Sequence, residues 1–526
     1  IKIYVLLACL WTVSAVQAQS FGSPAMRKLQ MAEFAISNFY VDKVDEDKLV
    51  EEAIIKMLAQ LDPHSTYSDA EEVKKMNEPL QGNFEGIGVQ FQMIEDTLLV
   101  VQPVSNGPSE KIGILAGDRI IAVNDSAIAG VKMSTEEIMK RLRGPKGSKV
   151  NLKIVRRGVQ DPLVFTVKRD KIPILSLDAS YMIQPKTGYI RINRFGATTA
   201  EEFKKAMKEL QKQGMKDMIL DLQGNGGGYL NAAIDLANEF LGQKELIVYT
   251  EGRTAKRSDF YAKGNGEFRN GRLIVLVDEY TASASEIVSG AVQDWDRGII
   301  VGRRSFGKGL VQRPIDLPDG SMIRLTIARY YTPAGRCIQK PYDSSTDYNK
   351  DLIERFNHGE LMNADSIHFP DSLKVQTKKL GRTVYGGGGI MPDYFVPIDT
   401  TLYTDYHRNL VAKGAVIKFT MKFIEGHRKE LANKYKKFES FNEKFIIDDD
   451  MLATLREMGE KEGVKFNEEQ YQKSLPLIKT QLKALIARDL WDMNEYFRVM
   501  NTTNESVQKA LEILNSEEYQ KKLRAN

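Results

Sequence analysis

Short apolar runs at strand spacing are followed by glycine or small-residue turns through the middle of this chain. A mostly apolar stretch at residues 218–222, a continuous β-branched and leucine run at 273–277 and a short apolar run at 298–302 predict three short strands, the second of them buried. The first continues through a glycine cluster into a helix that places Leu230 and Ala233 on one face, and the second continues through an Ala/Ser-rich turn into another helix. The pattern therefore predicts two strand, turn and helix units.

The outer regions follow a helical pattern. Residues 26–60 show apolar positions at helical spacing and predict two amphipathic helices, suited to packing or to a dimer arm. From residue 406 to the end, Lys/Glu-rich helices are expected, with their charges on solvated faces. Residues 341–379 are polar and irregular, which indicates an insertion in the core.

The turn after residue 277 and the loop near residue 308 contain the parts of a serine-lysine dyad. Ser283 and Ser285 lie where a helix begins, and free backbone N–H groups at a helix N-terminus can hold an oxyanion. Lys308 lies between Gly307 and Gly309, which allow the close packing that excludes water. A lysine acts as a base only when neutral, so burial has to lower its pKa from the ordinary value of about 10.4.

Other interpretations of these residues stay open at this point. An Ala/Ser-rich stretch is also typical of tight helix packing, and a Gly-Lys-Gly sequence is typical of a surface turn. Residues 302–308 fit the phosphate-loop pattern G-x-x-x-x-G-K after an apolar strand. However, Gly309 replaces the Ser or Thr that would bind magnesium, and no helix is expected after Lys308 to receive a phosphate.

A glycine cluster follows the strand at 218–222, at Gly224, Gly226, Gly227 and Gly228. It does not fit the dinucleotide pattern G-x-G-x-x-G. One use for it is a backbone N–H donor for a tetrahedral intermediate, with the amide of Ala284 as partner. A turn that needs positive φ at the start of a helix is the other interpretation.

Six ordered motifs between residues 61 and 397 together resemble the C-terminal processing, or tail-specific, serine peptidases. The motifs are LDPHSTY, DLQGNGGGYL, TASASEIVSGA, FGKGLVQ, YYTPAGRCIQ and GGGGIMPDYFVP. The resemblance implies a serine endopeptidase whose α/β core is the fold shared with crotonase-like enzymes. It also implies an inserted PDZ domain, with helical N- and C-terminal regions outside the core.

The resemblance assigns roles to particular residues. Ser283, rather than Ser285, corresponds to the nucleophile of the family, and Lys308 corresponds to its general base. Gln312 corresponds to the residue that orients the lysine. Gly227 or Gly228, together with Ala284, would form the oxyanion hole. The chain departs from many relatives at Gln223, where they have arginine, and this puts a local structural contact in question.

Residues 82–171 resemble a PDZ domain. They contain a glycine turn into an alternating strand, a helix opened by Ser134 and Glu137 in a capping box, and a final hairpin. A PDZ domain binds an extended peptide by strand addition and captures its terminal carboxylate with backbone N–H groups. In this chain the capturing turn would be Gly86, Ile87, Gly88 and Val89. Arg143 lies where some relatives have an arginine that couples the PDZ domain to the active site, or it is an ordinary solvated arginine.

Composition limits the function further. The 526 residues, 42% hydrophobic, suffice for several cores of roughly 100 to 200 residues each. A net charge of +4 does not indicate a nucleic-acid partner. The two cysteines, Cys9 and Cys337, cannot build a disulfide framework or a zinc cluster, and the five histidines lack metal-ligand spacing. His64 is interpreted as a turn residue, and no metal, cofactor or ATP is expected.

The first residues predict export. Residues 1–18 contain a lysine, an apolar run too short to span a membrane, and a small-residue cleavage signal at residues 16–18. They are typical of a secretory signal peptide, which places the protein outside the cytoplasm, in a bacterial periplasm. Residues 6–9 also partly match the pattern of a lipoprotein signal, so lipidation at Cys9 and association with a membrane stay open.

The sequence therefore predicts an exported serine endopeptidase that selects unfolded or tail-exposed protein substrates by their C-terminal ends. A homo-oligomer or an adaptor protein as partner stays open. The alternatives are a PDZ-bearing scaffold with a degenerate peptidase core and, third, a nucleotide-binding protein. The predicted divisions are a signal peptide (1–18), an N-terminal helical region (19–81), a PDZ domain (82–171), a peptidase core (172–400) and a C-terminal helical region (401–526).

Overall fold

The computed structural model describes residues 23–342, 348 and 350–524. The predicted signal peptide and Cys9 lie outside the described residues. The chain forms two compact units, each considered by itself below. The smaller one contains the described residues up to Ala70 together with Arg313–Thr326, and the larger one contains the remainder.

The smaller unit contains the two predicted N-terminal helices, α2 (Pro24–Phe39) and α3 (Glu46–Leu58). Ser23 caps α2 and Asp45 caps α3, each accepting a hydrogen bond from a first-turn amide. The short strand β1 (Thr66–Ser68) pairs antiparallel with the first half of β18 (Met322–Tyr331). The turn before β1 is held by Asp62, whose carboxylate accepts from the amide of His64 at 2.8 Å. His64 is therefore part of a turn, as the sequence predicted.

The predicted PDZ region begins after α4 (Ala70–Gln81) and has a sheet in the order β3-β4-β5-β7-β8, so that β3 is an edge strand. Buried and exposed residues alternate strictly along β7, which is the pattern of a strand with one face on a core. Its elements are β2 (Asn83–Gly86), β3 (Val89–Ile94), β4 (Thr97–Pro103), α5 (Pro108–Lys111), β5 (Arg119–Val123), β6 (Ser126–Ala127), α6 (Thr135–Leu142), β7 (Lys149–Val155), β8 (Leu163–Lys168) and β9 (Asp170–Pro173).

The core is built on a sheet in the order β10-β11-β12-β15-β16-β21, parallel from β11 onward, whereas β10 runs antiparallel to β11. A second sheet pairs β13 with β14 and with the end of β18. The core elements not yet given are β10 (Leu177–Gln184), β11 (Thr187–Ile192), α7 (Thr199–Lys212), β12 (Asp217–Asp221), α8 (Leu230–Asn238), β13 (Leu246–Glu251), β14 (Ser258–Tyr261), β15 (Leu273–Val277), α9 (Ala284–Asp294), β16 (Ile299–Gly302), β17 (Leu310–Asp316), α10 (Asp351–Asn357), β19 (Lys374–Gln376), β20 (Thr383–Tyr385) and β21 (Tyr394–Phe395).

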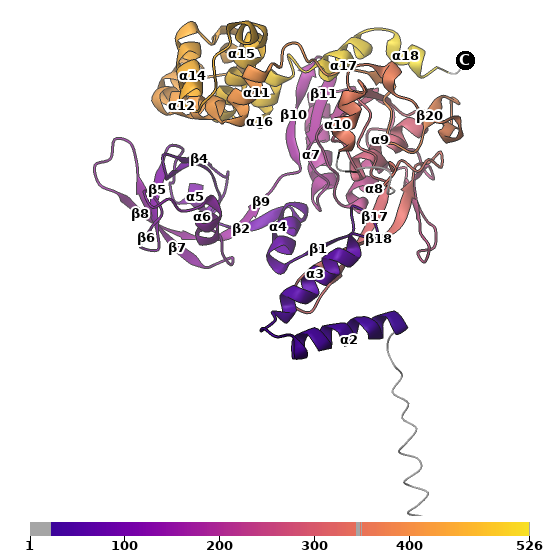
Figure 1. Cartoon of the computed structure of the whole chain (residues 1–526). Helices are drawn as coiled ribbons and strands as arrows, with labels where there is room; N and C mark the ends of the chain where they lie inside the picture. Colours follow the sequence, from indigo (N-terminus) through magenta and orange to yellow (C-terminus); the bar gives the residue numbers. More distant parts are fainter. Residues whose placement is uncertain (1–22, 343–347, 349, 525–526) are drawn as a thin grey trace, which may run out of the picture. The chain divides into compact units, whose positions relative to one another are not determined.

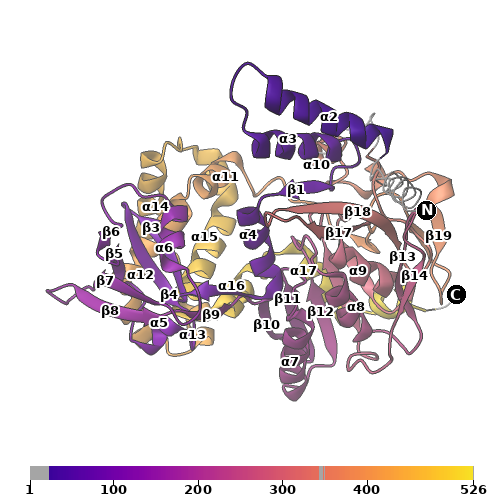
Figure 2. The same cartoon turned by 90° about the horizontal axis from the view of Figure 1, so that it is seen from below.

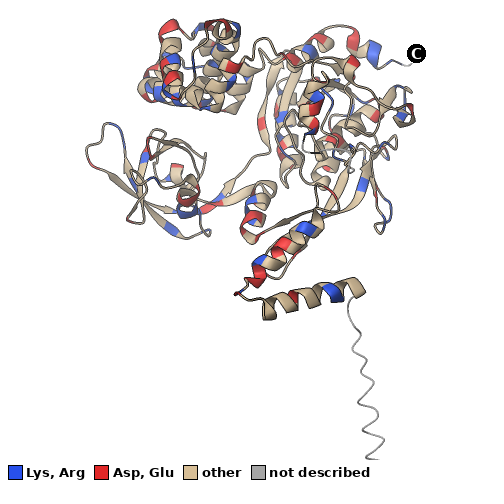
Figure 3. Ribbon diagram, in the orientation of Figure 1, with Lys and Arg blue, Asp and Glu red and all other residues tan. Residues whose placement is uncertain are grey.

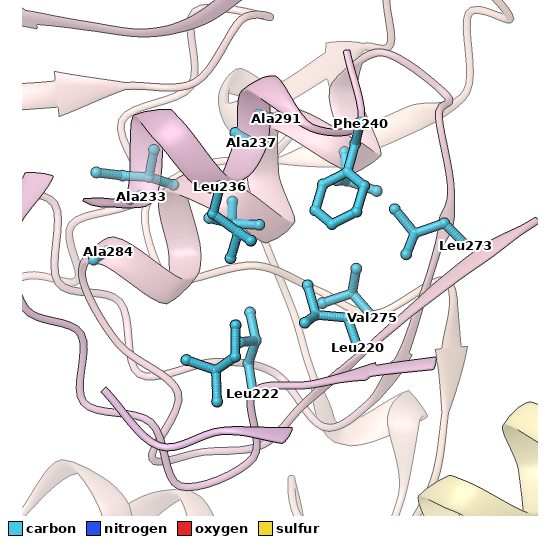
Figure 4. Close-up of a cluster of buried hydrophobic side chains, with 14 of the residues drawn as sticks. Leu220, Leu222, Ala233, Leu236, Ala237, Phe240, Leu273, Val275, Ala284 and Ala291 are labelled. Atoms are coloured by element: carbon cyan, nitrogen blue, oxygen red, sulfur yellow. The ribbon is translucent and has the colours of Figure 1, made fainter. Parts of the chain in front are cut away.

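The two faces of the main sheet are covered by different helices. Leu273, Val275 and Val277 of β15 pack on the face covered by α8 and α9, which lie side by side (Figures 2 and 4). The intervening Ile274 and Leu276 belong to a second buried cluster, on the opposite face. Because both faces are covered, the central strands β15 and β16 are apolar throughout, which is why they could be predicted as continuous runs.

The C-terminal region divides into two parts. The helices α11 (Asp405–Ala412), α12 (Ala415–Lys434), α13 (Phe438–Lys444), α14 (Asp449–Lys461), α15 (Glu468–Leu490) and α16 (Met493–Met500) enclose an apolar core of their own. Basic and acidic residues are interspersed along them (Figure 3). The last two helices, α17 (Glu505–Asn515) and α18 (Glu518–Lys522), instead cover the second face of the main sheet (Figure 1).

One prediction about local structure was incomplete. Residues 341–379, expected to be irregular, include α10 and the 3₁₀ turns at Ala364–Ser366 and Asp371–Leu373. These elements are too short to show a periodic apolar stripe, so the sequence pattern could not predict them. No helix in the described part of the chain is long and apolar enough to cross a membrane.

Candidate active site

Ser283 occupies a strained turn between strand β15 and helix α9. Its backbone has φ 57° and ψ −114°, a region that residues other than glycine rarely adopt. A serine on a sharp turn from strand to helix is the arrangement of a nucleophile elbow, in which the hydroxyl projects from the top of the sheet. The side chain is half-buried, and the next residue, Ala284, is the first of α9.

Ser285 has a different environment from Ser283. It is fully buried within the first turn of α9, and its hydroxyl donates to the carbonyl oxygen of Asn225 at 3.0 Å. The amide of Ala282 donates to the same carbonyl oxygen. Ser285 thus connects the turn that contains Ser283 to the glycine turn at residues 224–228, which is a structural role.

The glycine turn lies directly against the serine turn. A β-carbon on Gly227 would be 2.8 Å from Cβ of Ser283 and 3.0 Å from the amide nitrogen of Ala284. The amide of Gly227 donates to the side chain of Asn225 at 2.8 Å. By contrast, the amides of Gly228 and Ala284 have no acceptor among the described residues. Of the two glycines considered from sequence, Gly228 has the N–H that is not already used.

Lys308 lies in the loop that joins β16 to β17 and is half-buried. Its side-chain nitrogen donates to the side-chain oxygen of Gln312 at 3.2 Å. The flanking glycines permit close packing, as the sequence predicted. A β-carbon on Gly309 would be 2.8 Å from the amide nitrogen of Gln339, and one on Gly307 would be 3.1 Å from that of Gly389.

The buried carboxylate of Glu286 connects the two turns. Its Oε2 accepts from the backbone amides of Ser283 at 2.8 Å and of Lys308 at 2.9 Å. Its Oε1 accepts from the amide of Gly307 at 2.7 Å and from the hydroxyl of Ser305 at 2.5 Å. Burial raises the pKa of Glu286 to about 7, although these four hydrogen bonds act in the opposite direction.

Tyr330 makes a second connection. Its buried hydroxyl lies within hydrogen-bonding distance of the carbonyl oxygens of Ser283 (3.1 Å) and of Lys308. Burial raises the pKa of Tyr330 well above its usual range, so the hydroxyl remains a donor. The backbones of Ser283 and Lys308 are therefore linked at both their amides and their carbonyls.

Neither Glu286 nor Tyr330 was assigned a role from the sequence. Glu286 lies three residues after Ser283, and this S-x-x-E spacing is a helix-start signature that could have drawn attention to it. Tyr330 gives no comparable signal, because its partners are 47 and 22 residues away in the sequence.

The phosphate-loop alternative lacks its structural context. The residues after Lys308 form the strand β17, whereas a phosphate loop leads into a helix whose N-terminus receives the phosphate. In addition, no group of His, Cys, Asp or Glu side chains in the described ranges is arranged to hold a metal ion.

In the PDZ region, the four residues predicted to bind a peptide terminus form the turn between β2 and β3. Gly86 ends β2, and Val89 begins the edge strand β3. Gly88 has φ +73°, and a β-carbon there would be 2.9 Å from the side chain of Ile172. The carbonyl of Ile87 accepts from Ser109, while the amides of Ile87 and Gly88 have no acceptor within the described ranges.

Two further residues singled out from sequence have defined contacts. Gln223 accepts a hydrogen bond from Asn504 at 3.1 Å, so the position where relatives have arginine contacts the segment that leads into α17. Arg143 pairs with Glu78 on α4 at 2.5 Å and lies over the ring of Phe84. It is therefore not simply a solvated side chain.

Residues 186–346 match the model of peptidase family S41, and residues 86–171 match that of a PDZ domain. Residues 12–72 match the N-terminal domain of the activating protease CtpB, and residues 406–492 match a family of unknown function, DUF8443.

Three related proteins give the extent of the similarity. The carboxy-terminal processing protease CtpB of Bacillus subtilis is 36% identical over 330 residues, which cover 62% of this chain and 68% of that protein. The carboxy-terminal-processing protease of Bartonella bacilliformis is 40% identical over 307 residues, covering 57% and 69%. Among solved structures, a photosystem II D1 C-terminal processing protease is 30% identical, with 60% of this chain and 91% of that chain covered and a TM-score of 0.34. The chain therefore belongs to peptidase family S41, as a carboxy-terminal processing serine protease with a PDZ domain.

Proposed function

We propose that this protease cleaves peptide bonds with Ser283 as nucleophile and Lys308 as general base. The observation that carries the proposal is the strained position of Ser283 at the start of α9, close to Lys308. The backbone amides of these two residues donate hydrogen bonds to the same carboxylate oxygen, Oε2 of Glu286. Two hydrogen bonds to one oxygen keep the two backbones close. Ser285 is a poorer candidate, because its hydroxyl is buried and already donates to a carbonyl.

In the proposed reaction, the hydroxyl oxygen of Ser283 attacks the scissile carbonyl carbon while the neutral amine of Lys308 takes the hydroxyl proton. The ammonium of Lys308 then gives that proton to the departing amine, which leaves an acyl enzyme. Water hydrolyses the ester, again with Lys308 as base. The hydrogen bond from Lys308 to Gln312 would hold the lysine side chain in the direction of the serine.

The negative oxygen of the tetrahedral intermediate would be held by the amides of Gly228 and Ala284. Both N–H groups lack an acceptor within the described residues, and Ala284 is at a helix N-terminus, where the helix dipole favours negative charge. Removing one such donor in serine proteases costs about 100- to 1,000-fold in kcat.

We infer that the PDZ domain selects protein substrates by their C-terminal ends. The edge strand β3 can accept an added strand, and the amides of Ile87 and Gly88 lie at its start with no acceptor in the described part of the domain. A terminal carboxylate at Gly86, Ile87, Gly88 and Val89 would satisfy them. Unfolded or tail-exposed proteins are the substrates that present such an end.

We also propose that the protein is exported to a periplasm. The support is the sequence of residues 1–18, with its lysine, short apolar run and small-residue cleavage signal. Fractionating cells that express the chain with and without these residues tests the proposal. Equal retention of both forms in the cytoplasm would contradict it.

A fluorophosphonate probe and a peptide-hydrolysis assay test the catalytic assignment. Ser283→Ala should lose both labelling and hydrolysis, and Lys308→Ala should lose hydrolysis by several powers of ten, since the two residues act as one unit. Ser285→Ala is the matched control and should retain measurable turnover. Hydrolysis should persist in chelator and without ATP. If Lys308→Ala is as active as the wild type, the lysine is not the base, and if the wild type neither labels nor cleaves, the chain is a scaffold with a degenerate core.

A further inference from the structure

Glu286 is the only carboxylate among the described residues that receives hydrogen bonds from both candidate catalytic segments. It is the third residue of α9, and its exposed fraction is 0%. Substrate therefore cannot touch it, and any influence it has on catalysis acts through other residues. Each of its two oxygens accepts hydrogen bonds from two donors, so both oxygens are needed as acceptors.

We propose that Glu286 is a positioning residue that fixes the distance between the nucleophile and the base by binding both of their backbones with one carboxylate. The inference rests on the proposed function, because it takes Ser283 and Lys308 to be the reacting pair. Oε2 accepts hydrogen bonds from the amides of both Ser283 and Lys308. Oε1 accepts from the amide of Gly307, in the loop that contains the lysine.

The arrangement needs two acceptor oxygens, and this gives the proposal its sharpest test. Glutamine has the same shape but offers one acceptor oxygen and one NH₂ donor. In Glu286→Gln, the NH₂ group must face either the amides of Ser283 and Lys308 or the amide of Gly307. In each case a donor faces a donor, and one of the two connections is lost. A displacement of about 1 Å between reacting groups can cost about 100-fold in rate.

Glu239 is the matched control. It is also a buried carboxylate of the core, but it lies at the opposite end of α8 from the glycine turn. It pairs with Lys204 at 3.1 Å and accepts from the amide of Glu267. Glu239→Gln therefore makes the same substitution at a comparably buried carboxyl group without touching either candidate catalytic segment.

The experiment measures kcat, KM, the rate of fluorophosphonate labelling and the melting temperature of the full chain. For Glu286→Gln we expect kcat and labelling to fall by about 100-fold with KM within about threefold of the wild type. Glu239→Gln should keep kcat within about threefold, even if its melting temperature falls. A general loss of stability would affect both variants alike, whereas a positioning role affects kcat in one of them.

If Glu286→Gln does not fold, Glu286→Asp provides a second test. Aspartate keeps both carboxyl oxygens but is one methylene shorter, so it cannot reach both segments, and kcat should fall by more than about tenfold. Wild-type kcat in a folded Glu286 variant, or equal losses of kcat in the Glu286 and Glu239 variants, would overturn the proposal. Failure of the catalytic assignment is separate, because it would show as an active Ser283→Ala.

Discussion

The backbone of Gly227 packs so closely against Ser283 that no side chain fits between them. A β-carbon on Gly227 would be 2.8 Å from Cβ of Ser283 and 2.8 Å from the carbonyl oxygen of Ala282. Gly227 also has φ +99°, a conformation that only glycine adopts without strain. The glycine turn and Ser283 are therefore in direct contact, and a change in either should affect the other.

Gly227→Ala should lower kcat/KM by more than about 100-fold, because the new methyl group must displace Ser283 or close off the amide of Ala284. Gly226→Ala is the control. A β-carbon on Gly226 has no atom within 4 Å, so this variant should keep its activity. Peptide hydrolysis by both variants, with circular dichroism to verify folding, checks the prediction. Full activity of Gly227→Ala would contradict the close packing.

Glu286 should make folding stability depend on pH. Burial raises its pKa from 4.5 to about 7 in the folded protein. Because the folded pKa is the higher one, the stability that the protonated side chain provides below pH 4.5 is lost as the pH rises through about 7. The loss is of the order of 3 kcal/mol. Burial, and to a smaller extent the charge of Glu286, raises the pKa of the Tyr330 phenol well above its usual range, so it should stay neutral throughout.

Urea unfolding of the wild type and of Glu286→Gln from pH 4.5 to 8 measures this effect. The difference between their free energies of unfolding should change in favour of the variant as the pH rises, because glutamine does not ionise. A difference that stays constant over this range would show that folding does not raise the pKa of Glu286.

Amidation of a peptide C-terminus should weaken its binding to the PDZ domain. A charge-assisted hydrogen bond from the amides near Ile87 and Gly88 contributes roughly 1.5 to 3 kcal/mol, so affinity should fall by roughly 10- to 100-fold. Calorimetry measures the affinities of matched free-acid and amide peptides. The Ser283→Ala protein is used so that the peptides are not cleaved during the measurement. Identical affinities would mean that this domain does not recognise tails.

The C-terminal helix α17 should be essential for the stability of the core, since it covers one face of the main sheet. Ile513 is 0% exposed and packs with Ile219, Ile274 and Leu276. Ile513→Ala should lower the free energy of unfolding by about 2 to 5 kcal/mol. Glu512→Ala on the same helix, an exposed position, should change it by less than about 0.5 kcal/mol. Equal denaturation midpoints for Ile513→Ala and the wild type would show that α17 is dispensable.

Short stretches of the sequence were enough to predict most of the local elements of this chain. The buried strands β15 and β16 appear as uninterrupted apolar runs because both faces of the sheet are covered. The cap at Ser134 and the turns into α8 and α9 depend on residues only a few positions apart, so they can be recognised in the sequence. Six ordered motifs then indicated the family, which the comparisons confirm.

The contacts between distant groups became visible only in the folded chain. The sequence could not show from local spacing that Ser285 turns its hydroxyl to Asn225, sixty positions away, or that Gly227 has already used its amide while Gly228 has not. Nor could it show that Glu286 and Tyr330 converge on the same two backbones. Hydrogen bonds between distant segments depend on how the sheets and helices pack, and neither periodicity nor a turn signature encodes that packing.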